Sequence, residues 1–394
     1  MSDPPDDFVV LVLNNGSSSL KLALYRFQNG NMNKLVWGEA EEIGNQGGCV
    51  WLRGNPETAL EENRSFADAG EAAQFLIRAM FKGSLPVPQA AGHRIVHGGP
   101  RLREHQRITP EVLDQLAQAV PFAPLHLPSA LRVIQQATAA FPKLPQIACF
   151  DTAFHRTIPE HAARLPFARD FWDKGLMRYG FHGLVCESVV RTLGTDLPPR
   201  AVVAHLGNGC SLTALQNGCS MDTTMGLTPT GGVMMGTRSG DLDPGVFLNL
   251  LGSGYTYERL DSLLNHHAGL LGVSAAASDM RRLLELSEKD SNARLAIQMF
   301  CYSIRKSIGS LAAVLGGIDM LIFSGGIGEH AGAVRAEICT GLEHLGVVLD
   351  QSANRQNARR ISVQQSKCEV RIADADEDLE IAMHARQLLD SSCK

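Results

Sequence analysis

Two arginines, an aspartate and a histidine lie in short motifs whose composition suits phosphoryl transfer. Arg94 lies in Gly-His-Arg-Ile-Val-His-Gly-Gly and Arg238 in Met-Gly-Thr-Arg-Ser-Gly-Asp, and both glycine-rich contexts predict loops from which a guanidinium projects into a cleft. Arginine forks bind carboxylate and phosphate oxygens in bidentate fashion, and transfer of a γ-phosphoryl group requires neutralised equatorial oxygens. The alternative for each arginine is a surface ion pair. Asp151, after the strand-like Gln-Ile-Ala-Cys-Phe, and His182, in Gly-Phe-His-Gly, complete this set.

An apolar run over residues 8–13 breaks at Asn-Asn-Gly-Ser-Ser-Ser and resumes as an alternating strand over residues 20–25. This pattern predicts a hairpin with a polar tip. The groups that the tip offers belong to Asn14, Ser17, Ser18, Ser19 and Lys21. Such turns present backbone N–H donors and hydroxyls that suit a polyphosphate with its Mg²⁺. The alternative is a solvated turn, because serine and glycine are ordinary turn residues.

Residues 201–218 repeat the order of features found in that first hairpin. Each copy has an apolar strand, Asn-Gly, a small polar tip, Ser-Leu and a second strand that ends near Asn-Gly, at Asn29-Gly30 and Asn217-Gly218. The repeat predicts two similarly folded halves, each with a phosphate-type hairpin, with chance similarity between hairpins as the alternative.

Other phosphate-binding classes are excluded by the sequence. It contains no Gly-Lys dipeptide, hence no Walker A loop, and no Gly-x-Gly-x-x-Gly of the Rossmann or protein-kinase type.

A net charge of −5 provides no basic footprint and argues against nucleic acid as a partner. Nine scattered cysteines without Cys-x-x-Cys indicate reduced thiols, and neither a signal peptide nor a spanning apolar run is expected, so we predict a cytoplasmic protein.

Helix-like and strand-like patterns alternate along the 394 residues, which predicts an α/β protein of two domains. A helix should open at Thr109-Pro110-Glu111, and the prolines of residues 121–128 should force an irregular segment. The clearest helix covers residues 293–315 and ends at Gly316-Gly317, before a buried strand over residues 320–323. A turn at Gly326-Ile327-Gly328 is expected after that strand, where backbone could approach a nucleotide closely. A last helix is expected over about residues 376–389.

Eight motifs occur in the order typical of one family. They are Gly-His-Arg-Ile-Val-His-Gly-Gly (92–99), Ala-Pro-Leu-His (123–126), Cys-Phe-Asp-Thr-Ala-Phe-His (149–155), Arg-Tyr-Gly-Phe-His-Gly (178–183), His-Leu-Gly-Asn-Gly-Cys-Ser (205–211), Met-Met-Gly-Thr-Arg-Ser-Gly-Asp-Leu-Asp-Pro (234–244), Ser-Asp-Met-Arg (278–281) and Phe-Ser-Gly-Gly-Ile-Gly-Glu-His (323–330). Over residues 8–385 the chain resembles the acetokinase family of the acetate and sugar kinase, chaperone and actin superfamily. The resemblance implies two actin-like (ribonuclease H-like) α/β domains flanking an active-site cleft, residues 1–151 with 380–394 and residues 152–379.

The resemblance also implies roles for the polar candidates. Arg94 would bind the acyl carboxylate, and Arg238 and His182 would stabilise the phosphoryl group in the transition state. Asp151 occupies the family's acid/base position. Because a carboxylic acid substrate is already ionised at neutral pH, we expect Asp151 chiefly to orient an arginine and help hold Mg²⁺. Asn14 and Glu377 match the metal ligands, with the register in Asp-Glu-Asp (376–378) open by one residue; Mg²⁺ is expected, with Mn²⁺ as the alternative.

Further contacts follow from the same resemblance. The expected ATP-binding residues are Ser17, Ser19, Lys21, His205, Leu206, Gly207, Asn208, Gly209, Asp279, Met280, Arg281, Gly326, Ile327, Gly328, Glu329 and His330. The expected apolar pocket beside the substrate methyl group comprises Val96, Leu125, Phe181 and Pro229. The chain departs from the family pattern at Leu127, at Leu-Val-Cys (184–186), at Thr-Gly-Gly (230–232) and at His330, and none of these departures removes a proposed catalytic group.

The resulting hypothesis is a reversible, Mg²⁺-requiring transfer of the γ-phosphoryl group from ATP to acetate, which gives acetyl phosphate and ADP by direct in-line attack. A homodimer is implied by resemblance, with no nucleic-acid or membrane partner. One alternative keeps the chemistry but prefers propionate or butyrate, because one methylene changes discrimination by only about 1–3 kcal/mol. The other is an actin-like or chaperone-like ATPase switch, which two substrate-side arginines argue against.

Overall fold

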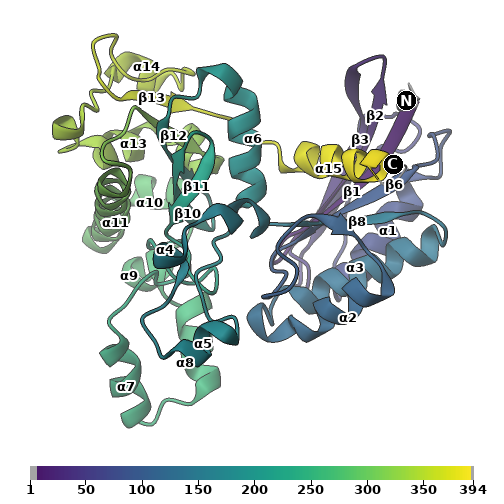
Figure 1. The fold of residues 1–394 in the computed structure, drawn as a ribbon, viewed down its shortest axis with the longest axis horizontal. Coiled ribbons are helices and arrows are strands. Elements are labelled where there is room, and N and C mark those ends of the chain that lie inside the picture. The colour runs from purple at the N-terminus through teal and green to yellow at the C-terminus, as the bar shows by residue number, and fades with distance from the viewer. Residues whose placement is uncertain (1–6, 392–394) are drawn as a thin grey trace. The chain divides into compact units, whose positions relative to one another are not determined.

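The computed structural model describes residues 7–391, which form two compact units. Unit 1 comprises the described residues up to Ala153 together with those from Asp376 onward, and unit 2 runs from Phe154 to Ala375. In Figure 1, unit 1 is purple and blue with a yellow C-terminal helix, and unit 2 runs from teal through green to the yellow of strand β13 (Glu369–Ile372). The prediction of no signal peptide rests on residues 1–7, of which 1–6 lie outside the described residues, as does the ninth cysteine, Cys393.

Unit 1 is built on a sheet with the strand order β5-β4-β3-β2-β1-β6-β8-β7. Its strands are β1 (Asp7–Asn15), β2 (Leu20–Gln28), β3 (Asn31–Glu41), β4 (Cys49–Arg53), β5 (Leu60–Asn63), β6 (Ala90–Ile95), β7 (Gln106–Arg107) and β8 (Gln146–Phe150). Strands β1 and β2 are antiparallel, whereas β6 runs parallel to β1 and β8 parallel to β6. The predicted first hairpin is confirmed, and the parallel register brings the C-terminal ends of β1, β6 and β8 to one edge of the sheet.

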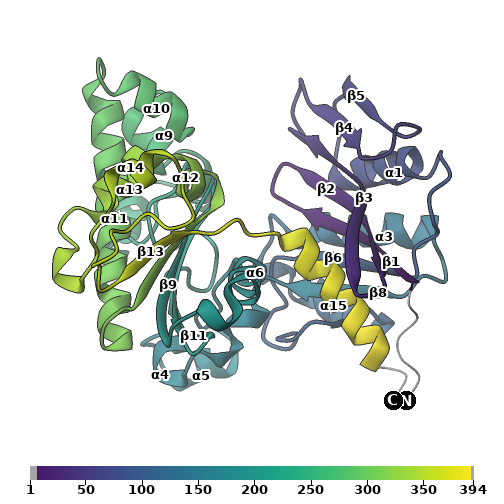
Figure 2. The same ribbon diagram turned by 90° about the horizontal axis from the view of Figure 1, so that it is seen from above.

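Helices cover both faces of the unit 1 sheet (Figure 2). They are α1 (Ala69–Met80), α2 (Pro110–Gln118), α3 (Leu127–Ala140) and α15 (Glu377–Ser391), with the short 3₁₀ turns η1 (Val120–Phe122) and η2 (Ala153–Thr157). Helix α1 buries its apolar stripe against Leu11, Leu13 and Leu22, while α15 lies on the opposite face, along β1 and β6. A Cβ atom at Gly92 would lie 2.5 Å from Ile381 Cγ2, so this glycine is required for close packing of β6 against α15.

Unit 2 repeats the arrangement with the strand order β11-β10-β9-β12-β13. Its strands are β9 (Arg200–Leu206), β10 (Cys210–Gln216), β11 (Cys219–Thr223), β12 (Met320–Ser324) and β13 (Glu369–Ile372). This order matches β3-β2-β1-β6-β8 of unit 1, with three antiparallel strands followed by two parallel ones. Both turns after the second strand have positive φ at an Asn-Gly pair, with φ of 51° and 73° at Asn29-Gly30 and 52° and 78° at Asn217-Gly218. The sequence repeat is therefore a structural repeat.

The helices of unit 2 flank its sheet and extend from it. Helix α6 (Gly183–Leu193) covers one face, where Val185 and Val189 pack on Val203 and Ile322, and α11 (Ser291–Leu315) lies on the other (Figure 1). The remaining helical elements are α4 (Glu160–Ala163), α5 (Arg169–Asp173), η3 (Gly194–Asp196), α7 (Pro244–Gly252), α8 (Tyr257–His266), α9 (Gly269–Ser274), α10 (Met280–Leu286), α12 (Gly325–His330), α13 (Gly332–Cys339), η4 (Glu343–Leu345) and α14 (Gln351–Arg355).

Most predicted helix boundaries are confirmed, and one segment is corrected. The Thr109 hydroxyl accepts a hydrogen bond from Val112 N at the start of α2, and α11 ends at Gly316 with φ of 69°. The irregular segment predicted for residues 121–128 ends early, because α3 begins at Leu127. Pro128 occupies the first turn of that helix, where its missing N–H costs nothing, and Leu127 is buried in the core.

The eight described cysteines are all free thiols, as predicted. Within residues 7–391, no helix has both the length and the apolar character needed to cross a bilayer.

Candidate active site

A buried ion pair lies where the parallel strands of unit 1 end. Arg94 Nε and Nη2 donate to the two carboxylate oxygens of Asp151, at 3.0 and 2.7 Å, and Asp151 is only 1% exposed. The prediction that Arg94 lies in a loop was wrong: Arg94 is part of strand β6, beside β8, whose end carries Asp151. The neighbouring glycine that suggested a loop serves helix packing instead. Both Asp151 oxygens accept hydrogen bonds from Arg94, which is the contact that the predicted orienting role of Asp151 requires.

Asn14 joins this pair to two further carboxylates. Its Oδ1 accepts from Arg94 Nη1 at 3.2 Å, while Nδ2 donates to Glu377 Oε2 at 3.1 Å and Asp378 Oδ1 at 2.9 Å. Arg94 Nη1 also lies 3.7 Å from Glu377 Oε2. Burial opposes the charged form, but the carboxylates of Asp151, Glu377 and Asp378 outweigh it and raise the pKa of Arg94, so the guanidinium stays charged. Asp378 also belongs to this cluster; the sequence left open whether it or Glu377 is the metal ligand.

The donor set at the end of α15 fits a hard cation. Glu377 and Asp378 each direct a carboxylate oxygen at Asn14 Nδ2. Rotation of the Asn14 amide would replace Nδ2 by Oδ1, so that three oxygen atoms would face one another. Carboxylate and amide oxygens are the ligands that Mg²⁺ takes, together with water and phosphate oxygens.

The tip of the first hairpin is exposed, as its composition predicts. Ser17 is exposed, Ser19 is partly buried, and Gly16 N donates to Ser19 O at 2.8 Å. Lys21 is exposed and lies directly opposite Asn14 in the β1–β2 register. The tip therefore carries hydroxyls and an ammonium beside the Asn14 cluster, within reach of solvent anions.

In unit 2, two candidate side chains converge on the tip of the second hairpin. A Cβ atom at Gly209 would lie 3.4 Å from His182 Nε2 and 3.7 Å from Arg238 Nη1. His182 Nδ1 is hydrogen-bonded to the buried Ser211 hydroxyl at 2.9 Å, which leaves Nε2 pointing towards the tip. Sequence reasoning missed Ser211, although it lies in the motif of residues 205–211. Together these groups form a polar surface around a glycine backbone.

Arg238 has no carboxylate partner among the residues that the structure describes. Its recorded hydrogen bond runs from Nη1 to the Pro229 carbonyl at 3.2 Å. The side chain is partly buried, and desolvation lowers the pKa of its guanidinium. The prediction that Arg238 lies in a loop is confirmed. The alternative, a surface ion pair, is not found in the described part of the chain, because the Arg238 hydrogen bond goes to a backbone carbonyl. A cation that is desolvated without a counter-ion favours an anionic ligand.

The remaining nucleotide candidates of unit 2 lie around the same tip. Gly207, Asn208 and Gly209 form the turn itself, and the Asn208 carbonyl accepts from Gly236 N, two residues before Arg238. His205 and Leu206 end strand β9, and the His205 ring lies 4.7 Å from that of His182. A Cβ atom at Gly236 would lie 3.6 Å from the Asn208 carbonyl and 3.5 Å from that of Ser278, the first residue of the next motif.

In that next motif, residues 279–281 differ in exposure. Asp279 caps α10 by accepting from Arg282 N at 2.9 Å, and Met280 is buried. Arg281 projects into solvent, with 89% of its side chain exposed. The Asp279 side chain is 57% exposed and its Oδ2 lies 3.9 Å from Arg281 Nε, so both charged side chains are accessible to a ligand and only Met280 is not.

The glycine motif of residues 325–330 is helical, which corrects an expectation. We expected a turn at Gly326-Ile327-Gly328, but these residues belong to helix α12. Glu329 Oε1 accepts from Gly325 N at 2.7 Å and so replaces a missing N-cap, while His330 is exposed. Gly326 is exposed, and Gly325 lies against the Leu206 carbonyl, where a Cβ atom would come within 2.8 Å.

Arg335 is a supporting residue that sequence reasoning missed. It is completely buried and donates from Nη1 to the Gly328 carbonyl at 2.8 Å. Its other donors reach Asn354 Oδ1, Asn354 O and Asn357 Oδ1 at 2.7–2.8 Å. Arg335 therefore anchors α12 on α13 and α14 without any carboxylate.

The four apolar pocket candidates are divided between the units. Val96 is buried just after β6, and Leu125 is 51% exposed in the segment before α3. Phe181 is buried beside His182, and Pro229 is partly buried, with its carbonyl on Arg238. The family departures at residues 184–186 lie in the first turn of α6, where all three side chains are buried, so they serve packing.

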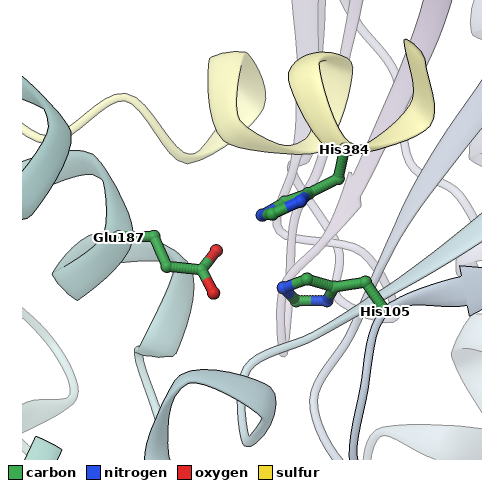
Figure 3. Close-up of side chains that lie close together, drawn as sticks. All are labelled: His105, Glu187 and His384. Atoms are coloured by element: carbon green, nitrogen blue, oxygen red, sulfur yellow. The ribbon is translucent and has the colours of Figure 1, made fainter. Parts of the chain in front are cut away.

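Two histidines, His105 and His384, support the C-terminal end of strand β8. His105 Nδ1 accepts from Phe150 N at 3.0 Å, one residue before Asp151. The His105 ring lies against that of His384 of α15, with centroids 4.0 Å apart and the ring planes tilted by 43° (Figure 3). These contacts fix the backbone that carries Asp151.

The repeated sheets and their hairpin tips define an actin-like, two-domain phosphotransferase. Residues 9–383 match the sequence profile of the acetokinase family. The chain belongs to the acetokinase family, whose members use ATP and a divalent metal ion.

Known relatives agree with this assignment over nearly the full length. The chain is 42% identical to an acetate kinase from Methylocella silvestris over 398 residues, which cover 97% of this chain and 98% of that one. It superposes on the crystal structure of Porphyromonas gingivalis acetate kinase with a TM-score of 0.86 and 35% identity, covering 97% and 100% of the two chains. A propionate kinase from Francisella tularensis gives a TM-score of 0.88 and 33% identity, with the same coverage.

Proposed function

We propose that this protein transfers the γ-phosphoryl group of ATP to acetate and forms acetyl phosphate and ADP reversibly. The observation that carries the proposal is Arg238, a desolvated cation without a carboxylate partner in the described chain, beside His182 and the hairpin tip. These groups would neutralise the equatorial oxygens of the transferring phosphoryl group, which is the main catalytic requirement of such a reaction.

The second group, in unit 1, supports the acceptor side of the proposal. Arg94 has N–H donors left after its bonds to Asp151 and Asn14, and these would hold the acetate carboxylate. Asp151 has both oxygens bonded to Arg94, which favours an orienting role over proton abstraction. The acetate oxygen would then attack the γ-phosphorus directly and in line, without a phosphoryl-enzyme.

Mg²⁺ is the proposed metal, held by Asn14, Glu377 and Asp378. When bound, it would supply charge neutralisation on the phosphate oxygens. The residues themselves do the positioning: the N-terminal turn of α15 presents both carboxylates, and rotation of the Asn14 amide would turn Oδ1 from Arg94 towards them. Lys21, Ser17 and Ser19 at the adjacent tip, and in unit 2 residues 205–209, 279–281 and 326–330, would contact the nucleotide.

The test of this function is a hydroxylamine trap with acetate, propionate or butyrate, MgATP and the purified protein. We expect hydroxamate from acetate at the highest kcat/KM. Higher kcat/KM with propionate or butyrate would favour the alternative of a longer acyl group, for which the propionate kinase neighbour is the specific observation. Acetate-independent ATP hydrolysis without hydroxamate would instead favour an ATPase switch.

Val96 is expected to set acyl-chain length. It is buried immediately after β6, two residues from Arg94, and alanine there would open room for additional methylenes. Val96→Ala should lower the acetate-to-butyrate ratio of kcat/KM by about 10-fold, within the 1–3 kcal/mol that a methylene supplies. An unchanged ratio would place the specificity pocket elsewhere, for instance around Leu125 and Pro229.

A homodimer is proposed as the assembly, with α7 as its contact. This helix has no buried residue, and Val246, Leu248 and Leu251 are 39%, 71% and 49% exposed. Adjacent apolar side chains of this kind mark an interface. Light scattering should give twice the chain mass, and Leu248→Glu should halve it; a monomeric wild-type protein would refute the assembly.

The free thiols favour a reducing compartment, and we propose the cytoplasm.

A further inference from the structure

The backbone before α6 adopts an unusual conformation just where His182 is presented. His182 has φ of 59° and ψ of 32°, the left-handed region, and Gly180 has φ of 75°. A residue other than glycine in this region costs about 1–3 kcal/mol and persists only where its surroundings impose it. The aim of the His182 ring at the hairpin tip therefore depends on contacts that hold residues 180–182.

One of those contacts comes from a completely buried imidazole, His155. Its Nε2 lies 2.9 Å from the Phe181 carbonyl, which only accepts, so Nε2 carries the proton and donates. Its Nδ1 lies 2.9 Å from the Ser220 hydroxyl of β11, which therefore donates to it. Burial lowers the pKa of His155 to about 4, so the ring is neutral at physiological pH and keeps this tautomer.

The ring also shapes the path of the chain beside it. A Cβ atom at Gly180 would lie 2.6 Å from both Cγ and Cδ2 of His155, and 2.6 Å from Thr223 Cγ2. The backbone at Gly180 therefore lies directly against the imidazole. The Thr157 hydroxyl donates to the Ser220 carbonyl at 2.8 Å, which ties the turn that carries His155 to the same strand.

We propose that His155 is a positioning residue for the phosphoryl transfer: by donating to the Phe181 carbonyl it holds the peptide before His182 and keeps the His182 imidazole aimed at the transferring phosphoryl group. The inference rests on the function proposed above. His155 itself lies too deep to touch substrate, since only 2% of it is exposed. A shift of about 1 Å in a catalytic group costs up to about 10²-fold in rate, so loss of this hydrogen bond should appear in kcat.

Three variants separate positioning from simple stability. His155→Phe keeps a ring but removes both hydrogen bonds, and His155→Gln keeps an amide donor near the position of Nε2. Ile308→Ala, in the buried face of α11, is the matched control for lost stability. Ser220→Ala replaces His155→Phe should the latter fail to fold, because it removes the hydroxyl donor to Nδ1 that fixes the tautomer in which Nε2 donates to the Phe181 carbonyl.

Kinetics are measured in the hydroxylamine assay, well below the lowest Tm of the set. We expect His155→Phe to lower kcat by about 10-fold or more with KM for acetate and ATP within twofold, and His155→Gln to recover most of kcat. Ile308→Ala should lower Tm with kcat within twofold. A His155→Phe kcat within twofold of wild type, or no recovery in a folded His155→Gln, would overturn the proposal.

Hydrogen exchange of the peptide that contains residues 178–186 provides a readout independent of activity. Exchange should be faster in His155→Phe than in wild type and close to wild type in His155→Gln. If the wild-type protein makes no hydroxamate but the variants show this exchange pattern, the proposed function is refuted while the backbone role of His155 stands. Unchanged exchange in a hydroxamate-forming protein would refute the role of His155 alone.

Discussion

Replacement of Arg238 by alanine is expected to reduce kcat by about 10²–10³-fold without loss of stability. Removal of one electrostatic stabiliser of a transition state has an effect of this size. The guanidinium is desolvated and has no carboxylate partner among the described residues, so alanine leaves no charge unpaired and relieves a cost of burial. The variant should therefore unfold at a Tm equal to or above that of wild type.

Arg238→Lys is the matched variant for this experiment. It keeps the positive charge but loses the planar fork, and we expect it to recover only part of kcat, because a point charge cannot bind two phosphoryl oxygens in the same geometry. The measurements are kcat in the hydroxylamine assay and Tm by calorimetry. Near-normal turnover in Arg238→Ala would show that this arginine does not face the phosphoryl group.

Replacement of Arg94 by alanine should abolish activity and destabilise the protein together. The variant leaves Asp151, 1% exposed, without the guanidinium that satisfies both of its oxygens. Breaking a buried ion pair from one side costs about 3–5 kcal/mol. A loop arginine would contribute little to the core, but Arg94 lies in strand β6, so we expect its loss to affect stability as well as activity.

The double variant Arg94→Ala/Asp151→Ala is the control for the ion pair. It removes both charges, so it should be more stable than Arg94→Ala alone while remaining inactive. Urea unfolding of the wild type, both single variants and the double variant provides the coupling free energy. Equal stability of Arg94→Ala and wild type would mean that solvent or another group satisfies Asp151, contrary to the geometry.

Local sequence patterns were sufficient to predict the parts of the fold with short-range causes. The β1–β2 hairpin, its echo in β9–β10 and the helix that ends at Gly316 all follow from periodicity and turn residues. The φ values at Asn29-Gly30 and Asn217-Gly218 agree within 5°, which explains why the repeat was visible in the sequence, because each turn requires the same residue pair.

The errors concern residues whose role depends on distant partners. Gly92 suggested a loop, but its requirement comes from Ile381, which is nearly 300 positions away in the sequence. Gly326-Ile327-Gly328 suggested a turn, but Arg335 and Glu329 stabilise a helix there. The hydrogen bond between His155 and Phe181 was likewise invisible, since no local pattern pairs a 3₁₀ turn with the start of α6.

The most direct test of the account is ³¹P NMR of the purified protein with MgATP, with and without acetate. We predict that the γ-phosphate signal is replaced by that of acetyl phosphate only when acetate is present, and that adding ADP to acetyl phosphate regenerates ATP. Release of inorganic phosphate at the same rate with and without acetate, with no acetyl phosphate signal, would contradict it.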